Sequence, residues 1–293
     1  MERRTFYRDR FSPGVLSTLS WLLEILSSLG DGPLPQPQRR TQPAASNGDV
    51  GPLPVIAVTG LRAEASIATG RQIVTLSGCG DAPGLAQRLE TVAAHGASAI
   101  ISFGVAGGLA PGIAPGTVLV ARTVIAEDGA RYDSDRAWAR RLSATLSGAM
   151  VADIAGIDLP VSGIAERRDL YRKTGALAAD TESHVAARVA TAFGLPLAVF
   201  RVVADPAYRQ LPHAALVAIR PDGSLAVDAI LGSLLRNPRQ LPQLMRTAND
   251  ARAAFVALFR GRMMLAHSLG FGDSRELPLE LPAEEVVGGP LPV

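Results

Sequence analysis

Short apolar runs alternate with segments of helical periodicity between residues 53 and 271 of this chain. The apolar runs are continuous, which is typical of strands that are buried on both faces of a parallel sheet. We predict strands over 55–59, 73–77, 97–103, 117–126, 157–162 and 197–204. We predict helices over 84–95, 135–146, 181–193, 226–235 and 241–267. This order predicts an α/β fold with a mixed, mostly parallel central sheet that is covered by helices on both sides.

Both ends of the chain lack this alternation. Residues 1–52 start with an Arg-rich segment and end in a Pro-rich linker, and between the two the apolar positions 15, 16, 19, 22, 23, 26 and 29 share one helical face. We expect a flexible leader in which residues 13–30 contact a membrane surface. The alternatives are a helix docked on the domain or on a partner, or sequence upstream of the true start codon. Residues 272–293 hold four prolines and four glutamates, which predicts a disordered tail.

Composition narrows the class of protein. A chain that is 47% hydrophobic and 19% charged has the balance of a folded globular protein. The single cysteine, Cys79, excludes a disulfide framework and a zinc ribbon, and we predict no metal site. Among 29 basic residues only Lys173 is a lysine, so a bound anion would have to be held by arginine and backbone amides. The net charge of +2, without a basic stripe interleaved with aromatic residues, argues against nucleic acid as a partner.

Glycine or a polar residue follows several of the predicted strands. The segments concerned are 59–64, 77–81, 102–108 and 201–206. Because ligands of open α/β sheets bind at the carboxyl ends of the strands, we expect the functional site where these segments meet. The glycines around Cys79 do not have the spacing of a dinucleotide-binding motif, which excludes that cofactor class.

Four segments occur in an order and spacing that resemble one enzyme family. They are residues 55–64, the run Ser102-Phe103-Gly104-Val105-Ala106-Gly107-Gly108 with Gly116-Thr117-Val118 after it, Asp180-Thr181-Glu182-Ser183, and Arg201-Val202-Val203-Ala204-Asp205-Pro206. The chain is similar over 55–265 to the purine nucleoside phosphorylase and nucleosidase superfamily. The resemblance implies a single phosphorylase-like catalytic domain, over 53–271, that cleaves an N-glycosidic bond.

A narrower resemblance concerns the substrate. Residues 175–184, 201–207, 211–212, 218–223 and 234–242 look like those of hopanoid-associated phosphorylases. This implies a cytoplasmic enzyme, associated with the membrane through its leader, that cleaves adenosylhopane with inorganic phosphate. The products would be adenine and a phosphoribosyl or ribosyl hopane. The resemblance implies no cofactor beyond phosphate as co-substrate, and a homo-oligomer.

The resemblance also assigns roles to residues of this chain. Asp205 would be the acid that protonates the departing purine, and Glu182 would grip the ribose hydroxyls and offset the charge that builds on the sugar. The other predicted substrate-binding residues are Thr181, Ser183, Phe103, Gly104 and Ala204. The predicted phosphate-binding residues are Gly60, Arg62, Gly107 and Gly108. Two roles stay open for Glu64: activating water, as in nucleosidases of the family, or a structural role.

Three positions depart from the family pattern and keep other functions open. Thr181 replaces a usual Met, Ala204 a frequent Ser, and Val105 a phosphate-binding Ser. The first alternative is a nucleosidase or phosphorylase acting on soluble purine nucleosides of the methylthioadenosine type. The second is a purine-binding module without catalysis.

Overall fold

The computed structural model describes residues 53–78, 80–220, 223–265 and 267–272. The predicted leader over 1–52 lies outside these residues, as does the predicted tail apart from Gly272. Within the described ranges, no helix has both the length and the apolar character needed to cross a bilayer.

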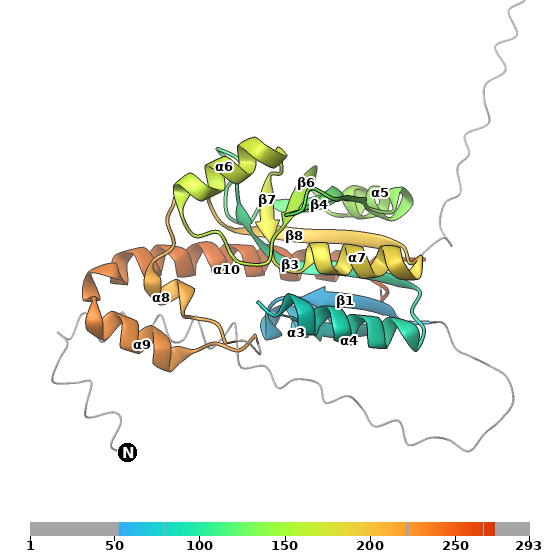
Figure 1. The fold of residues 1–293 in the computed structure, drawn as a ribbon, viewed down its shortest axis with the longest axis horizontal. Helices are drawn as coiled ribbons and strands as arrows, with labels where there is room; N and C mark the ends of the chain where they lie inside the picture. Colours follow the sequence, from blue (N-terminus) through green and yellow to red (C-terminus); the bar gives the residue numbers. More distant parts are fainter. Residues whose placement is uncertain (1–52, 79, 221–222, 266, 273–293) are drawn as a thin grey trace, which may run out of the picture.

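Eight strands form one sheet (Figure 1). They are β1 (Val55–Thr59), β2 (Ile73–Ser77), β3 (Ala99–Gly108), β4 (Val118–Ala126), β5 (Arg131–Asp133), β6 (Met150–Gly156), β7 (Ala178–Asp180) and β8 (Leu197–Asp205). Five of the strand pairs are parallel and three are antiparallel. The mixed, mostly parallel sheet predicted from the sequence is therefore confirmed.

The pairing of the strands closes a circuit inside this sheet. Strand β3 pairs with β8, β8 with β4, β4 with β6, β6 with β7, and β7 returns to the last two residues of β3. Strands β1 and β2 extend the sheet from β3, and β5 extends it from β4. This closure brings the carboxyl ends of β3, β7 and β8 to one place, although 70 or more residues separate β3 from the other two.

Helices cover both faces of the sheet, as predicted. They are α3 (Arg62–Ala68), α4 (Ala82–Ala94), α5 (Arg136–Thr145), α6 (Ile164–Thr174), α7 (Ser183–Phe193), α8 (His213–Leu216), α9 (Val227–Arg236) and α10 (Leu241–Met264), with a 3-10 turn at Pro238–Gln240. One core packs α4 and α7 against the sheet, and a second packs α5 and α10 against its other face. Side chains of β1 alternate between the two cores, Ile56 and Val58 in the first and Val55 and Ala57 in the second, because successive side chains of a strand point to opposite faces.

Helices α8 and α9 pack against the first part of α10, beside the sheet rather than on it (Figure 1). A separate small core holds them there, with Ala214 of α8, Ile230 of α9 and Leu244 of α10 among its buried members. The loop between α8 and α9 reaches the start of α3, where the Arg62 N–H donates to the Gly223 carbonyl at 3.2 Å. Gly223 has a φ of +76°, and a Cβ on it would lie 2.9 Å from the Gly60 carbonyl oxygen, so both backbone and space require glycine.

The predicted strand over 157–162 is wrong. The strand is β6, which ends at Gly156, and the next residues form the loop that leads to α6. Pro160 in that loop has no N–H to donate to a ladder. Asp153 interrupts the apolar residues of β6, whereas Ile157, Leu159 and Val161 alternate with other residues as in a half-buried strand, which explains the prediction.

Strand β3 is longer than predicted. The predicted strand ends at residue 103, whereas β3 continues through the glycine-rich run to Gly108. Parallel pairing with β8 and antiparallel pairing with β7 satisfy the backbone of these glycines. The run is therefore part of the sheet and not a loose phosphate-binding loop.

Candidate active site

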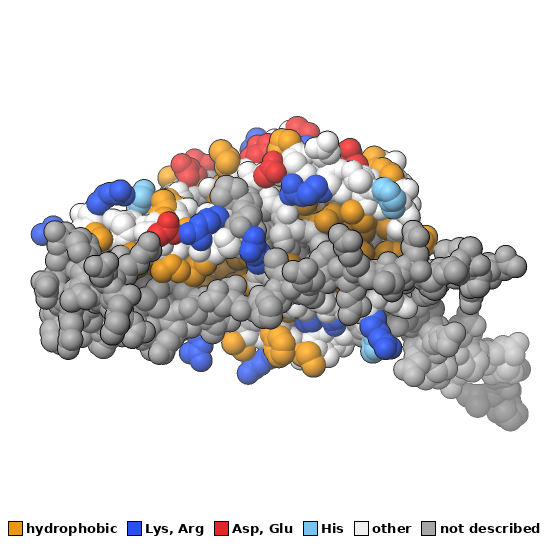
Figure 2. Space-filling view, turned by 90° about the horizontal axis from the view of Figure 1, so that it is seen from below, with side chains coloured by type: hydrophobic (Ala, Val, Ile, Leu, Met, Phe, Trp, Pro, Cys, Tyr) orange, Lys and Arg blue, Asp and Glu red, His pale blue; other side chains and the backbone are white. Residues whose placement is uncertain are grey.

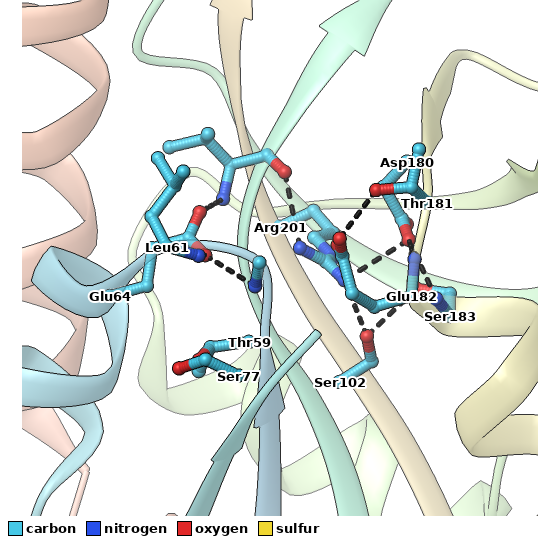
Figure 3. A network of polar contacts seen from close by, with 12 residues as sticks. Thr59, Leu61, Glu64, Ser77, Ser102, Asp180, Thr181, Glu182, Ser183 and Arg201 are labelled. Carbon is cyan, nitrogen blue, oxygen red and sulfur yellow. Dashed lines mark hydrogen bonds and ion pairs between the residues drawn. The ribbon is translucent and has the colours of Figure 1, made fainter. Parts of the chain in front are cut away.

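A buried arginine, Arg201 of β8, lies at the centre of a polar network that joins β8, β3 and the end of β7 (Figure 3). Its Nη2 donates to Ser102 Oγ at 2.6 Å, to Asp180 Oδ1 at 3.0 Å and to Glu182 Oε2 at 3.2 Å. Its Nη1 donates to the Val105 carbonyl at 3.2 Å. Nearby carboxylates raise the pKa of Arg201 against the opposing effect of burial, so the guanidinium is a fixed positive charge.

Asp180, the last residue of β7, connects this charge to the start of α7. Its Oδ1 accepts from the backbone N–H groups of Glu182 at 2.9 Å and of Ser183 at 2.6 Å. Its Oδ2 accepts from the Ser183 hydroxyl at 2.6 Å. Asp180 thus satisfies the free N–H groups of the helix end while it pairs with Arg201, which fixes where Glu182 begins the helix.

Glu182 is buried with its carboxylate between Arg201 and the Gly60 backbone. A Cβ on Gly60 would lie 2.9 Å from Glu182 Oε1, so the backbone passes very close to this carboxylate. The Thr181 hydroxyl donates to the same oxygen. Burial, together with the charges of Asp180 and Glu64, raises the pKa of Glu182 to about 7 in spite of Arg201. This carboxyl can therefore take up or give a proton near neutral pH.

Glu64 places its carboxylate among backbone N–H groups from two separate elements. Oε2 accepts from Gly60 and Leu61 at 2.8 Å each, which caps the start of α3. Oε1 accepts from Val105 of β3 at 2.7 Å. Burial raises the pKa of Glu64, while Arg201 and these three N–H groups oppose the shift. Converging backbone N–H groups of this kind suit an anion, and here a side chain of the protein occupies them.

Gly104 is required by this arrangement. A Cβ at Gly104 would lie 2.5 Å from Glu64 Oε1 and 2.8 Å from Arg201 Nη1. Both neighbours are buried and hydrogen-bonded, so neither can move away cheaply. The glycine thus lets β3 pass directly against the carboxylate and the guanidinium.

Asp205 ends β8 at the other side of the site. Its Oδ2 forms an ion pair with Arg167 of α6, whose side chain is only 2% exposed. Burial raises the pKa of Asp205, and the Arg167 charge opposes the rise. A carboxyl with a raised pKa is suited to donate a proton in the reaction.

A cavity of about 280 Å³ joins the two sides of the site. Asp205, Glu182 and Glu64 all line it, together with Gly60, Gly107, Thr181 and Ala204. Apolar side chains such as Ile157 and Phe255 form much of the remaining wall. A mostly apolar cavity with a few convergent polar groups is typical of a small-molecule site.

A second cavity, of about 170 Å³, adjoins the first and is lined mainly by apolar residues of α10, of the loop between α8 and α9 and of the start of α3. The two cavities share the lining residues Leu61, Ala215, Ile219, Thr247, Ala251 and Phe255. Leu61 follows Gly60, which contacts Glu182, so the second cavity opens beside the Glu182 side of the site.

Of the five residues predicted from the sequence to bind substrate, Thr181 and Ala204 line the main cavity, and Phe103, Gly104 and Ser183 do not. Phe103 does not line the cavity; it is fully buried in the second core, edge-on to Phe200 at 5.2 Å between ring centroids. Ser183 lies behind Asp180 rather than on the cavity wall.

The predicted phosphate-binding residues are divided between different surroundings. Gly60 and Gly107 line the main cavity, whereas Arg62 lines only the adjoining one. Gly108 is buried next to the backbone of Asp205: a Cβ there would lie 2.9 Å from the Asp205 carbonyl oxygen.

Neither of the two buried arginines of the site was predicted from the sequence. Arg201 had a signal, because a charged residue inside the apolar run 197–204 needs buried partners. Arg167 had none, because it lies in the strongly polar segment 164–174 among exposed charges. In the part of the chain that the structure describes, no group of three or more His, Cys, Asp or Glu side chains is arranged to hold a metal ion.

Comparison with solved structures finds the same fold in nucleosidases. The 5′-methylthioadenosine nucleosidase of Helicobacter pylori, in a variant with 5′-methylthioadenosine in its active site, is 15% identical, with 73% of this chain and 99% of that chain covered and a TM-score of 0.50. The 5′-methylthioadenosine/S-adenosylhomocysteine nucleosidase of S. pneumoniae is 16% identical, with 72% and 100% covered and a TM-score of 0.50. A futalosine hydrolase variant of Helicobacter pylori is 15% identical, with 52% and 91% covered and a TM-score of 0.46. At this identity the likeness of the two methylthioadenosine nucleosidases shows the fold alone.

The curated proteins contain no match to this chain. The family description "Phosphorylase superfamily" matches residues 51–236, which include β1 to β8 and every carboxylate of the site. The chain belongs to the phosphorylase superfamily, which includes nucleoside phosphorylases and nucleosidases.

Proposed function

We propose that this protein cleaves the N-glycosidic bond of a purine nucleoside and that water is the nucleophile. One observation carries the proposal: three buried carboxyls with raised pKa values, Glu64, Glu182 and Asp205, line a single cavity. Cleavage of this bond needs an acid for the leaving base and negative charge near the sugar. A separate group must activate the nucleophile.

Asp205 donates a proton to the ring nitrogen of the departing purine. Burial at the end of β8 favours the protonated carboxyl, which is the form that can donate. Glu182, at the start of α7, accepts hydrogen bonds from the ribose hydroxyls and offsets the positive charge that develops on the sugar ring. Ala204 and Thr181 complete the wall between these two carboxyls.

Glu64 acts on water. Its carboxylate takes a proton from the water molecule while the oxygen bonds to the anomeric carbon and the carbon–nitrogen bond breaks toward the base. The position of this carboxylate supports water over phosphate. The N–H groups of Gly60, Leu61 and Val105, which would suit a phosphate, already serve Glu64, and a phosphate anion would be repelled by it.

Phosphorolysis, as implied by the resemblance to hopanoid-associated phosphorylases, is the competing proposal. It would need Glu64 to leave its three N–H donors, or the phosphate to bind through Arg62 and Gly107. A first experiment incubates the purified chain with adenosine, inosine and 5′-methylthioadenosine and follows free base by chromatography. Base release by the wild type, reduced about 100-fold or more in Asp205→Asn, supports cleavage. Tight binding of the nucleosides without base release would support a binding module instead.

The adjoining cavity favours a nucleoside that carries an apolar substituent on its ribose. Its lining by Ala218, Leu225 and Leu244, together with its position beside Glu182, supports an apolar group near the sugar. Adenosylhopane is the specific candidate from the sequence resemblance. The part of its apolar skeleton next to the ribose would lie in this cavity. We expect adenosylhopane in detergent micelles to be cleaved with a higher kcat/KM than adenosine in the same micelles. An equal or lower kcat/KM for adenosylhopane would rule out the lipid nucleoside as the preferred substrate.

A further inference from the structure

Arg167 lines the active cavity but has no role in the reaction described above. It comes from α6, an otherwise polar helix whose next residue, Arg168, is exposed to solvent. The Arg167 guanidinium turns inward and forms the ion pair with Asp205 Oδ2. Burying a guanidinium is unfavourable unless partners compensate for the lost water, so an arginine that turns inward from a polar helix must be held by specific contacts.

Two backbone carbonyls fix the plane of this guanidinium. Nε donates to the Val161 carbonyl at 3.0 Å, in the loop before α6. Nη1 donates to the Pro206 carbonyl at 3.3 Å, directly after Asp205. Arg167 is thus anchored both to the loop before its own helix and to the residue that follows β8. Its ion pair with Asp205 then restricts the rotation of the Asp205 carboxyl.

The ion pair makes the two oxygens of Asp205 different. Oδ2 faces Arg167, whereas no hydrogen bond or ion pair to a described residue engages Oδ1. We propose that Arg167 is a positioning residue for Asp205: it holds Oδ2 so that Oδ1 meets the leaving base, and it controls how readily this carboxyl binds its proton. The proposal rests on the proposed function, in which Asp205 is the acid.

The charges around Asp205 make the effect predictable. Arg167 approaches from α6, while Arg209, after β8, and Asp250, on α10, form an ion pair with each other nearby. Burial raises the pKa of Asp205; Arg167 is the largest opposing influence, Asp250 adds to the rise and Arg209 opposes it. Removal of the Arg167 charge leaves burial largely unopposed, so the Asp205 pKa must rise further.

The test compares Arg167→Met, which keeps the apolar stem, with Arg167→Lys, which keeps the charge but not the planar fork. Arg168→Met, on the exposed side of the same helix, is the matched control. Carbon-13 NMR of aspartate-labelled protein follows the carboxyls through pH, and the signal missing from Asp205→Asn identifies Asp205. We expect its midpoint to rise by about 1–3 pH units in Arg167→Met and to stay near the wild-type value in Arg168→Met.

Kinetics test the positioning half of the proposal. The basic limb of the kcat/KM profile should move in the same direction as the NMR midpoint in Arg167→Met. In Arg167→Lys we expect a midpoint near that of the wild type, but a kcat reduced about 10-fold or more with little change in KM, because the oxygen is no longer held. This variant also serves if Arg167→Met does not fold.

The outcomes separate the two proposals. Wild-type turnover with an unchanged Asp205 midpoint in Arg167→Met, or a wild-type kcat in Arg167→Lys, overturns the role of Arg167 alone. Absence of any base release by the wild-type protein overturns the proposed function, and the positioning role with it.

Discussion

The Val105 N–H of β3 donates to the Glu64 carboxylate of α3 at 2.7 Å, across 41 residues of sequence. With this bond, all three converging backbone N–H groups, those of Gly60, Leu61 and Val105, donate to a carboxylate of the protein itself. The neighbouring positive charge, Arg201, already faces Asp180 and Glu182. We therefore propose that these N–H groups are not available to phosphate and that Glu64 is the base that activates water.

Removal of the Glu64 charge tests this interpretation. Glu64→Gln keeps a carbonyl oxygen for one set of N–H groups but cannot accept a proton from water. We expect kcat for base release to fall by about 100- to 10,000-fold, the usual range for a general base. Ser66→Ala, at an exposed position on the same helix, should leave kcat unchanged. A Glu64→Gln variant with wild-type kcat would restrict Glu64 to capping α3.

Two glycines of β3 provide a matched pair for stability. Gly104→Ala brings a Cβ within 2.5 Å of Glu64, whereas a Cβ on Gly107 would lie 3.6 Å from its nearest neighbour, Asp205 Oδ1. We expect Gly104→Ala to lower the free energy of unfolding by about 1–3 kcal/mol. Gly107→Ala should be neutral or stabilising by roughly 0.5–1 kcal/mol, as alanine is favoured over glycine in a strand. Denaturant unfolding measures both, and equal losses in the two variants would contradict the packing described for Gly104.

The pKa of Glu182 predicts how stability depends on pH. Its value in the folded protein, about 7, lies above the ordinary value of 4.5, so folding favours the protonated form. The stabilisation is present below pH 4.5 and is lost as the pH rises to about 7. The free energy of unfolding of the wild type should therefore fall over this window relative to that of Glu182→Gln. Glu90→Gln, on the exposed side of α4, controls for loss of a surface carboxylate. If the wild-type free energy of unfolding minus that of Glu182→Gln stays constant or rises with pH, Glu182 is already ionised over the whole window.

Filling the adjoining cavity tests the apolar subsite. Ala248 is buried on α10 and lines only that cavity, so Ala248→Leu reduces its volume without touching Asp205 or Glu182. We expect kcat/KM for a 5′-alkylthioadenosine with a long alkyl chain to fall about 10-fold or more relative to adenosine. Ala253→Leu, exposed on the same helix, should preserve the ratio of the two substrates. An unchanged ratio in Ala248→Leu would place the alkyl chain elsewhere.

The sequence predicts best those strands whose apolar residues follow one another in a single run. The runs that form β1, β2 and β8 are predominantly apolar, with Arg201 as the one charge inside the predicted ranges, and the predicted boundaries agree with the structure to within a residue. Strand β7 has only three residues, and it forms because it pairs with β6 and with the glycines that extend β3. No local pattern encodes such a strand, since both partners depend on long-range pairing.

The site residues also divide into those that the local sequence predicts and those that only the folded chain brings together. Asp205 and Glu182 stand at the end of a strand and the start of a helix, so their meeting at one cavity follows from the order of elements. The pairing of Asp205 with Arg167 depends on how α6 packs, and nothing local distinguishes Arg167 from Arg168. The filling of the N–H groups by Glu64 depends on the close passage of β3, which only the folded chain provides.

The most direct test of the account is the requirement for phosphate. Purified protein is incubated with the best purine nucleoside in phosphate-free buffer made with water enriched in heavy oxygen, and again with phosphate added. The account predicts equal base release in both and a free sugar that carries one heavy oxygen at the anomeric carbon. Base release only with phosphate, with a sugar 1-phosphate as the product, would contradict it.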